Sequence, residues 1–266
     1  MTIEDATEVV AVRYGYLDSS RSHQFYRYET YREPDGPIRL DYFFWVIRQP
    51  ASQGGTILVD SGYHPDAIAR RPGRVCVVPP VEALASIGIA ADQVSLVVVT
   101  HFHFDHIGNL AAFPNARYVV QRREFEYWTG PHALRPAVAA SVEPGEIAFI
   151  TEASQAGRVD LIDGDHEVAE GITARLAAGH CPGQQLVVIG AERPLALCSD
   201  ALHFREEMDR YMPFNVLFDV PKMYETYDRF NAWAAAGATI VPGHDPQVMA
   251  DYPAWPGADG LAVRLR

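Results

Sequence analysis

The sequence predicts an α/β fold, because runs of strand length alternate with helical segments along 266 residues. Val97–Thr100 and Ile172–Ala177 have the length and the β-branched content of buried strands. Pro221–Ala236 is typical of a long helix, since proline stands in its first turn and Gly237 follows its end. We expect one domain over residues 1–266, because no stretch rich in Pro, Gly or Ser divides the chain. This length would also allow two small domains.

Charge and composition exclude several classes of protein. The net charge of −12 argues against nucleic-acid binding, which normally rests on a basic patch. No apolar run approaches the roughly 18 residues of a membrane helix, and the acidic stretch 1–10 lacks the apolar region of a signal peptide. The three cysteines have no CxxC spacing, so neither a disulfide framework nor a cysteine-based zinc site is predicted. We expect a protein of the reducing cytoplasm that binds neither membranes nor nucleic acid.

Local patterns predict further elements. Asp41–Arg48 and Thr56–Asp60 are expected to form a hairpin around the turn 49–55. The other expected strands are Glu8–Val12, Arg117–Gln121, Arg158–Ile162, Leu195–Cys198 and Ala238–Val241, and the other expected helices are Pro80–Gly88, Ile107–Phe113, Arg122–Trp128 and His132–Ala140. Residues 129–158 are otherwise irregular, and a long insertion of this kind is often a lid or a pocket wall. Disorder or a dimer contact is the alternative for this segment, so a homodimer is possible.

Two segments are unusually aromatic. Tyr14–Tyr31 belongs to an expected N-terminal arm over residues 1–40, and Phe204–Phe218 lies near the last long helix. Such rings could pack on the domain surface or on a second subunit. The alternative is that some of them line a pocket for an apolar part of a substrate.

The chain is organised around Val97–Asn109, VVVTHFHFDHIGN, in which a buried strand leads into a cluster of metal-ligand residues. If the strand continues, its alternation would point His101, His103 and Asp105 to one side, with His106 opening a helix. Neutral imidazole and carboxylate are the ligands that Zn²⁺ takes in a site without sulfur. A surface histidine tract is the alternative, but it would not follow a buried strand.

Three later residues complete a pattern. His180 in AAGHCPGQQ, Asp200 in ALCSDALH and His244 in IVPGHDP each follow a strand-like run. Together with HFHFDH, they resemble the H-x-H-x-D-H signature and downstream ligands of the metallo-β-lactamase superfamily, over about residues 41–246. The resemblance implies an αβ/βα sandwich, with two mixed β-sheets packed face to face and helices outside.

The resemblance also implies a site for two Zn²⁺ ions per chain, although other divalent transition metals are possible. His101, His103 and His180 would hold one ion, Asp105, His106 and His244 the other, and Asp200 would bridge both. Asp60, in VDSGYHPD, would orient a ligand histidine. Two ions about 3.5–4 Å apart can hold a hydroxide that attacks a carbonyl. Asp105 would then serve catalysis as a ligand of the second ion.

Within the superfamily, the chain most resembles the N-acyl-homoserine lactonase-like branch, through GHCPGQQ and IVPGHDP. Dizinc β-lactamases differ, because they lack a histidine at the position of His106 and use cysteine at that of Asp200. Diiron relatives carry a glutamate in the first motif, which is absent here. Lactonases of this branch usually have tyrosine three residues after the bridging aspartate, where this chain has His203. This imidazole could donate to the substrate or act as a general acid, or could merely pack at the cleft rim.

The expected function is therefore a metal-dependent hydrolase that opens a lactone, or a related carboxylic ester, with an apolar part. A thioesterase of the glyoxalase II kind, or a phosphoester hydrolase, is the alternative on the same dinuclear site. A non-catalytic binding protein of the same fold is the third possibility, but such a protein would be expected to lose ligands. This chain has all seven.

Overall fold

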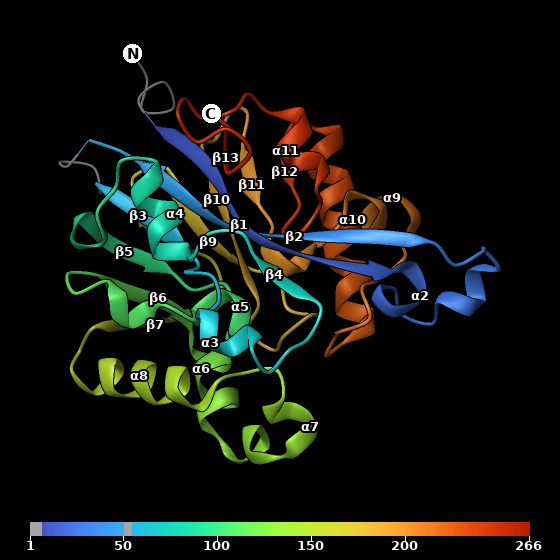
Figure 1. Cartoon of the computed structure of the whole chain (residues 1–266), viewed down its shortest axis with the longest axis horizontal. Coiled ribbons are helices and arrows are strands. Elements are labelled where there is room, and N and C mark those ends of the chain that lie inside the picture. The colour runs from blue at the N-terminus through green and yellow to red at the C-terminus, as the bar shows by residue number, and fades with distance from the viewer. Residues whose placement is uncertain (1–6, 51–54) are drawn as a thin grey trace.

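Two β-sheets pack face to face, and helices cover both outer faces (Figure 1). The computed structural model describes residues 7–50 and 55–266. Both sheets contain parallel and antiparallel strand pairs. The expected α/β class and the sandwich of two mixed sheets are thus confirmed.

The larger sheet carries the first half of the chain. Its strand order is β13-β1-β2-β3-β5-β6-β7, with β4 paired to β1. Its strands are β1 (Glu8–Ser20), β2 (Pro37–Arg48), β3 (Thr56–Val59), β4 (Arg74–Cys76), β5 (Val94–Val98), β6 (Arg117–Gln121), β7 (Val159–Ile162) and β13 (Ala262–Arg264). Because β3, β5, β6 and β7 are parallel, their carboxyl ends meet at one edge of the sheet.

The smaller sheet has the order β12-β11-β10-β9-β8. Its strands are β8 (His166–Ala169), β9 (Ile172–Leu176), β10 (Gln185–Ile189), β11 (Leu195–Leu197) and β12 (Thr239–Val241). The only parallel pair among these described strands is β11 with β12, so these two also end at the same edge.

The helices lie on the outer faces of the two sheets. They are α2 (Arg21–Gln24), α3 (Pro65–Ile68), α4 (Pro80–Ser86), α5 (Phe104–Ile107), α6 (Arg122–Thr129), α7 (Pro136–Ala139), α8 (Pro144–Gln155), α9 (Arg205–Arg210), α10 (Val220–Ala235) and α11 (Gln247–Asp251). Short 3₁₀ helices are η1 (Tyr28–Tyr31), η3 (Ala91–Gln93), η4 (Leu110–Ala112), η5 (Pro131–Leu134) and η6 (Ser199–Ala201). Helices α4, α5, α6 and α8 pack on the larger sheet, and α9 and α10 on the smaller one.

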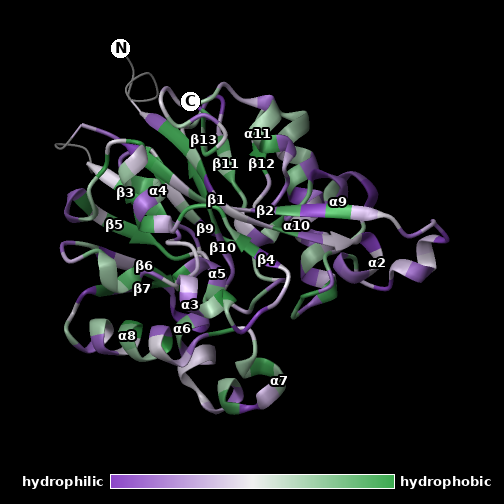
Figure 2. Cartoon of the chain, in the orientation of Figure 1, coloured by the Kyte–Doolittle hydropathy of each residue, from purple (hydrophilic) through white to green (hydrophobic). Residues whose placement is uncertain are grey.

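Apolar side chains fill the space between the sheets, and the strands are hydrophobic along most of their length (Figure 2). Alternation along β2 shows why: Phe43, Trp45 and Ile47 face the other sheet, while Phe44 and Val46 face the helices. A sheet covered on both faces needs apolar residues at consecutive positions. The resulting rigid sandwich holds the loops at its edge.

Several local predictions need correction. The expected helix Ile107–Phe113 is replaced by α5 and η4, and the expected helix His132–Ala140 is divided into η5 and α7. Helix α8 and strand β10 were not predicted, because an apolar run without caps or periodicity does not identify its element type. The first strand continues to Ser20, so residues 8–20 of the expected arm are part of the larger sheet.

Some predictions concern parts of the chain that the structure does not describe. The predicted hairpin of β2 and β3 is present, but residues 51–54 of its turn lie outside the described residues. Residues 1–6, which belong to the stretch that was compared with a signal peptide, also lie outside them. In the described residues, no helix combines the length and apolarity that crossing a membrane requires. The cytoplasmic location stays a prediction.

Glu124 on α6 joins three parts of the sandwich through its buried carboxylate. The backbone N–H of Phe102 (3.1 Å), the backbone N–H of Gly183 (2.7 Å) and the indole N–H of Trp128 (2.6 Å) all donate to it. Only glycine allows this close approach at position 183, because a Cβ there would lie 2.5 Å from the backbone of Glu124. Burial is the main cause that raises the pKa of Glu124, to about 7. This carboxylate thus ties the loop after β5 to the loop after β9.

We expect Glu124→Ala to lower the free energy of unfolding by about 3 kcal/mol at pH 6, because it leaves buried N–H groups without acceptors. The loss should shrink as pH rises toward 8. The folded pKa of about 7 lies above the ordinary 4.5, so the stabilising contribution of Glu124 falls as pH rises through this range. Denaturant unfolding of chelator-treated protein measures both effects, with exposed Glu126→Ala on the same helix as control. Equal stability of the two variants would contradict this role.

Candidate metal centre

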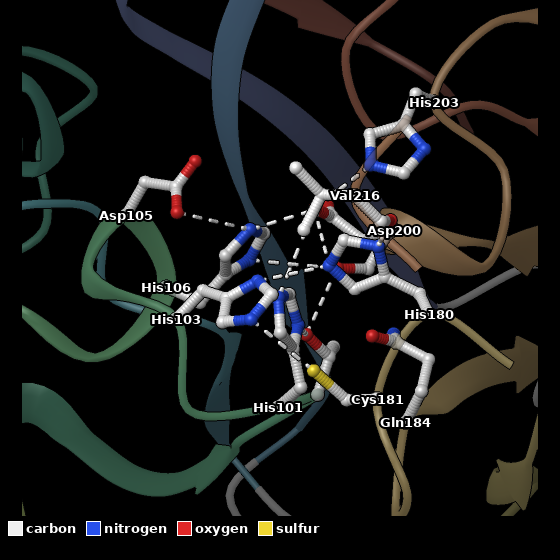
Figure 3. A network of polar contacts seen from close by, with 12 residues as sticks. His101, His103, Asp105, His106, His180, Cys181, Gln184, Asp200, His203 and Val216 are labelled. Carbon is white, nitrogen blue, oxygen red and sulfur yellow. Dashed lines mark hydrogen bonds and ion pairs between the residues drawn. The ribbon is translucent and has the colours of Figure 1, made fainter. Parts of the chain in front are cut away.

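The seven predicted ligand residues lie together at the edge where strands of both sheets end. Figure 3 labels all of them except His244. The loop after β5 carries the first two, His101 and His103, and α5 carries the next two. The segments after β9, β11 and β12 carry one each. All are at least nine-tenths buried. Their ligand atoms form groups in which all atoms lie within 4.8 Å of one another: His101, His103 and His180 with Cys181; His101, His106 and Asp200; Asp105, His106 and His244; and His180 and Asp200 with His203.

The route by which the first motif reaches this cluster differs from the prediction. Strand β5 ends at Val98, and Asp105 lies on α5. The alternation that was expected to align His101, His103 and Asp105 is therefore wrong. The backbone is extended at His103 and then turns into α5, so a short loop and a helical turn bring these side chains together.

Four of the five predicted histidines are fixed by Nδ1 and leave Nε2 for the cluster. Nδ1–H of His180 donates to the Val216 carbonyl (2.8 Å), and that of His244 to the Asp41 carbonyl (2.8 Å). Nδ1 of His101 contacts the Thr100 hydroxyl at 3.1 Å. His103 is reversed, since its Nε2 lies 3.4 Å from Cys181 Sγ. Metal-ligating histidines are oriented in this way by the partner of their other nitrogen.

Asp60 orients His106, the remaining histidine that is held by its Nδ1. The resemblance implied this kind of role for Asp60. Its Oδ2 lies 2.7 Å from Nδ1 of His106. The carboxylate also accepts the backbone N–H and the hydroxyl of Thr100, each at 2.8 Å, and the Ser199 hydroxyl at 3.3 Å. Asp60 has a positive φ of 64°, a backbone conformation that non-glycine residues seldom adopt. Loops from three strands are thus joined behind the cluster.

Asp200 lies at the centre of the cluster, and its two carboxylate oxygens face different histidines. Oδ1 is 3.0 Å from Nε2 of His244 and 3.2 Å from Nε2 of His106. Oδ2 is 3.3 Å from Nε2 of His180 and 3.7 Å from Nε2 of His101. The two oxygens therefore face two different pairs of histidines, His106 with His244 and His101 with His180.

Burial sets the direction of the pKa shift for three histidines of the cluster, whereas at His106 it is outweighed by nearby carboxylates, Asp200 first, which raise the pKa of that imidazole. Burial lowers the pKa values of His101 and His180, and it lowers that of His103 to about 4. Burial opposes ionisation of Asp200 also, but the surrounding imidazoles outweigh it and hold the pKa of Asp200 below its usual range. Neutral imidazoles beside an ionised carboxylate are the form in which these groups bind metal.

The donor set fits divalent transition metals. Nε2 of His101 and Nε2 of His106 are buried and have no hydrogen-bond partner. A buried polar atom without a partner is costly, and in both cases the atom faces the carboxylate of Asp200. Imidazole nitrogens and carboxylate oxygens suit zinc and its neighbours, and a coordinated ion would satisfy both nitrogens.

His203 lies against the same carboxylate. Its Nε2 is 3.1 Å from Asp200 Oδ2, its Nδ1 is 3.3 Å from Glu207 Oε1, and its ring stacks on Phe214 with centroids 3.6 Å apart. Burial lowers the pKa of His203, but the two carboxylates outweigh it and raise the pKa to about 9. Neither nitrogen makes a well-directed hydrogen bond in this arrangement, so Nε2 is free to serve another acceptor.

Sequence reasoning missed two residues of this site. Cys181 follows His180, and burial raises the pKa of its thiol; adjacency to a predicted ligand was the only signal. Glu207 accepts hydrogen bonds from the Tyr227 hydroxyl (2.6 Å) and the backbone N–H of His203 (2.9 Å). Its position four residues after His203, at the start of a helix, could have indicated this contact.

A cavity of about 390 Å³ opens above the cluster. Of the aromatic side chains in Tyr14–Tyr31 and Phe204–Phe218, all of which the structure describes, Phe214 alone lines it; most of the others pack into the core and into a cluster of buried rings. The alternative that some of these rings line a pocket therefore holds for Phe214, and most of the others pack within the protein. Ala140 and Ser141 also line the cavity, so the segment 129–158 contributes to its wall.

Comparisons with known proteins agree with this geometry. The family model of the metallo-beta-lactamase superfamily matches residues 39–244. The N-acyl homoserine lactonase AttM of Rhizobium radiobacter is 27% identical over 228 residues, 79% of this chain and 83% of the relative. AttM of Agrobacterium fabrum is 27% identical over 177 residues, 65% of this chain and 66% of the relative, which is slightly less than two thirds of its length.

Solved structures share the fold. An N-acyl homoserine lactone hydrolase with N-hexanoyl-L-homoserine bound at its catalytic metal center superposes with a TM-score of 0.72 at 20% identity, covering 96% of this chain and 99% of that one. AidC, a dizinc quorum-quenching lactonase, has a TM-score of 0.71 at 18% identity, covering 94% and 89%. Since the family model spans more than half of the chain and includes every residue of the cluster, the chain belongs to the metallo-beta-lactamase superfamily.

Proposed function

We propose that this chain is a dizinc hydrolase that opens lactones of the N-acyl-homoserine kind or related carboxylic esters. The observation that carries the proposal is the position of Asp200, whose two oxygens face separate sets of histidines. One ion would be held by His101, His103 and His180, the other by Asp105, His106 and His244, with Asp200 shared. The names of the relatives, which are N-acyl homoserine lactonases, support the lactone as substrate.

Two bound ions would supply Lewis-acid activation of water and of the ester carbonyl. The chain itself fixes the ligands in advance, through the contacts of Asp60 with His106 and of two backbone carbonyls with His180 and His244. The substrate would enter the cavity, whose lining includes the apolar side chains of Leu40, Phe214 and Val216. Preorganised groups of this kind stabilise developing charge without reorganising during the reaction.

His203 would donate a proton or a hydrogen bond to the substrate. Its Nε2 lies beside Asp200 at the base of the cavity, and its Nδ1 faces Glu207. Glu207 favours the protonated ring, while stacking on Phe214 fixes the plane of the ring. The ring N–H is therefore placed to reach the carbonyl oxygen or the leaving oxygen of an ester bound over Asp200.

We expect the zinc-loaded protein to hydrolyse members of a panel of lactones with different rings and side chains. The lactone panel is measured beside a glutathione thioester and a phosphodiester, by pH-stat titration or product chromatography. A protein that opens no lactone but cleaves one of the other two would refute the lactonase assignment and establish the alternative that the donor set also permits.

We expect two zinc ions per chain in protein loaded with zinc, and about one in Asp105→Asn. An amide oxygen is a weaker ligand than a carboxylate, so the ion held with His106 and His244 should be lost first. Turnover should fall by more than about tenfold, which is about 1.4 kcal/mol in the barrier. Mass spectrometric metal analysis measures the ions, and the exposed Asp66→Asn is the control. One ion or fewer in the zinc-loaded wild type would contradict the dinuclear site.

His203→Ala should lower kcat about tenfold and leave metal content at two. Loss of one donor from a preorganised site costs on the order of 10²–10³ in rate, and we expect less here because a metal shares the same oxygen. His203→Tyr should recover part of the rate, since a phenol can donate from a similar position. The exposed His166→Ala is the control. A loss of metal in His203→Ala would make His203 a ligand, and an unchanged kcat/KM would show that it only packs at the rim.

A further inference from the structure

The cavity above the cluster is lined by two arginines, Arg71 and Arg74, on the same wall. Both guanidinium groups lie against the ring of Phe104, with Cζ at 4.1 Å and 5.3 Å from its centroid. The two arginines differ in whether a carboxylate of the protein pairs with the guanidinium, and this difference bears on which substrate the cavity can bind.

Arg71 is paired within the protein, although its carboxylate partner, Glu143, also pairs with Arg70. Arg71 forms an ion pair with Glu143, and its guanidinium also donates to the carbonyls of Ala67 and Ala140, each at 3.0 Å. These contacts connect Arg71 to the segment that forms part of the cavity wall. Its charge and its donors are therefore already used.

Arg74 has no such partner. Among residues 7–50 and 55–266, no carboxylate lies within 4.0 Å of its guanidinium, and its buried Nε has no hydrogen-bond partner. Its polar neighbour in the cavity wall is Tyr42. Burial is the main cause that raises the pKa of Tyr42, the charge of Asp105 adds to it, and the charge of Arg74 opposes it. Tyr42 and Phe104 are both neutral and Asp105 forms no ion pair with Arg74, so no carboxylate is paired directly with this guanidinium.

The register of the larger sheet directs Arg74 into the cavity. Arg74 on β4 stands opposite Leu17 on β1, and both side chains line the cavity. Directly paired residues of antiparallel strands project from the same face of the sheet. The ring of Tyr42 lies 5.3 Å from that of His244, so Arg74 is close to the reacting centre without belonging to it.

A half-buried charge without a counter-ion is unfavourable unless a ligand supplies one. The guanidinium presents parallel N–H groups that match the two oxygens of a carboxylate. We propose that Arg74 binds a carboxylate carried by the substrate, so that the preferred substrates are anionic lactones or esters rather than those with a purely aliphatic side chain. The ester part of this statement rests on the proposed function, whereas the contact between Arg74 and a carboxylate does not.

The kinetic test compares two lactones with the same ring and the same chain length, one ending in a carboxylate and the other in a methyl group. For the zinc-loaded wild type, kcat/KM should be about tenfold or more higher for the acid, as expected for hydrogen bonds to a charged group. Arg74→Gln should remove this preference by slowing the acid alone, and Arg74→Lys should keep part of it. Arg39→Gln is the matched control, because Arg39 also stacks on a ring, that of Tyr16, but lies outside the cavity.

A binding test makes the outcome independent of turnover. Calorimetry measures the affinity of the zinc-loaded protein for the two ring-opened acids, of which one is a dicarboxylate and the other a monocarboxylate. The dicarboxylate should bind about tenfold more tightly than the monocarboxylate to the wild type, and Arg74→Gln should abolish this difference in affinity. The thermal unfolding midpoint of Arg74→Gln should be the same as that of the control Arg39→Gln.

The two tests separate the two proposals. If lactones are hydrolysed with no preference for the acid, and Arg74→Gln changes neither rate nor affinity, the inference about Arg74 is overturned and the proposed function stands. If no lactone is hydrolysed but the dicarboxylate binds through Arg74, the proposed function fails and the anion site stands.

Discussion

The structure depends on a carboxylate, Asp200, that is buried among imidazoles. Taking an ionised carboxylate out of water is unfavourable unless opposite charge or hydrogen-bond donors surround it. Here those partners come from loops that follow β5, β9, β11 and β12, which are far apart in the sequence. The fold satisfies this requirement by ending parallel strands of both sheets at one edge. A shift of any one strand by a single residue would leave the carboxylate without one of its neighbours.

The side of each histidine that faces away from Asp200 is equally constrained. The backbone carbonyls of Asp41 and Val216 accept from His244 and His180, and the carboxylate of Asp60 holds His106. These partners come from β2, from β3 and from the loop before α10. These imidazoles are thus held at Nδ1 with Nε2 turned toward the cluster, and the cost of ordering them is met when the chain folds rather than when a metal or a substrate binds.

The sequence indicated the cluster better than its surroundings. His101, His103, Asp105 and His106 are close in the chain, and the strand-like runs before His180, Asp200 and His244 place those residues at strand ends. The resemblance to the metallo-β-lactamase superfamily then joined the two groups into one ligand set. Glu124 could not be found in this way, since its significance depends on the backbone N–H groups that the fold brings to it, and the only signal for Glu207 was its spacing of four residues from His203. Aromatic composition was misleading for a related reason: Phe25, Tyr28 and Phe204 pack on one another, and composition does not distinguish a buried ring from a pocket wall.

The charge of the cavity illustrates the same limit most clearly. Arg71 and Arg74 are three residues apart, and nothing in their local sequence distinguishes them. Glu143 is some seventy residues further on, in a segment whose helices were only partly predicted, and its position decides which arginine keeps an uncompensated charge. The residues that perform the chemistry are set by strand ends, which are rigid and leave a pattern in the sequence. The residues that select the substrate are set by contacts between loops, and those contacts emerge only from the folded chain.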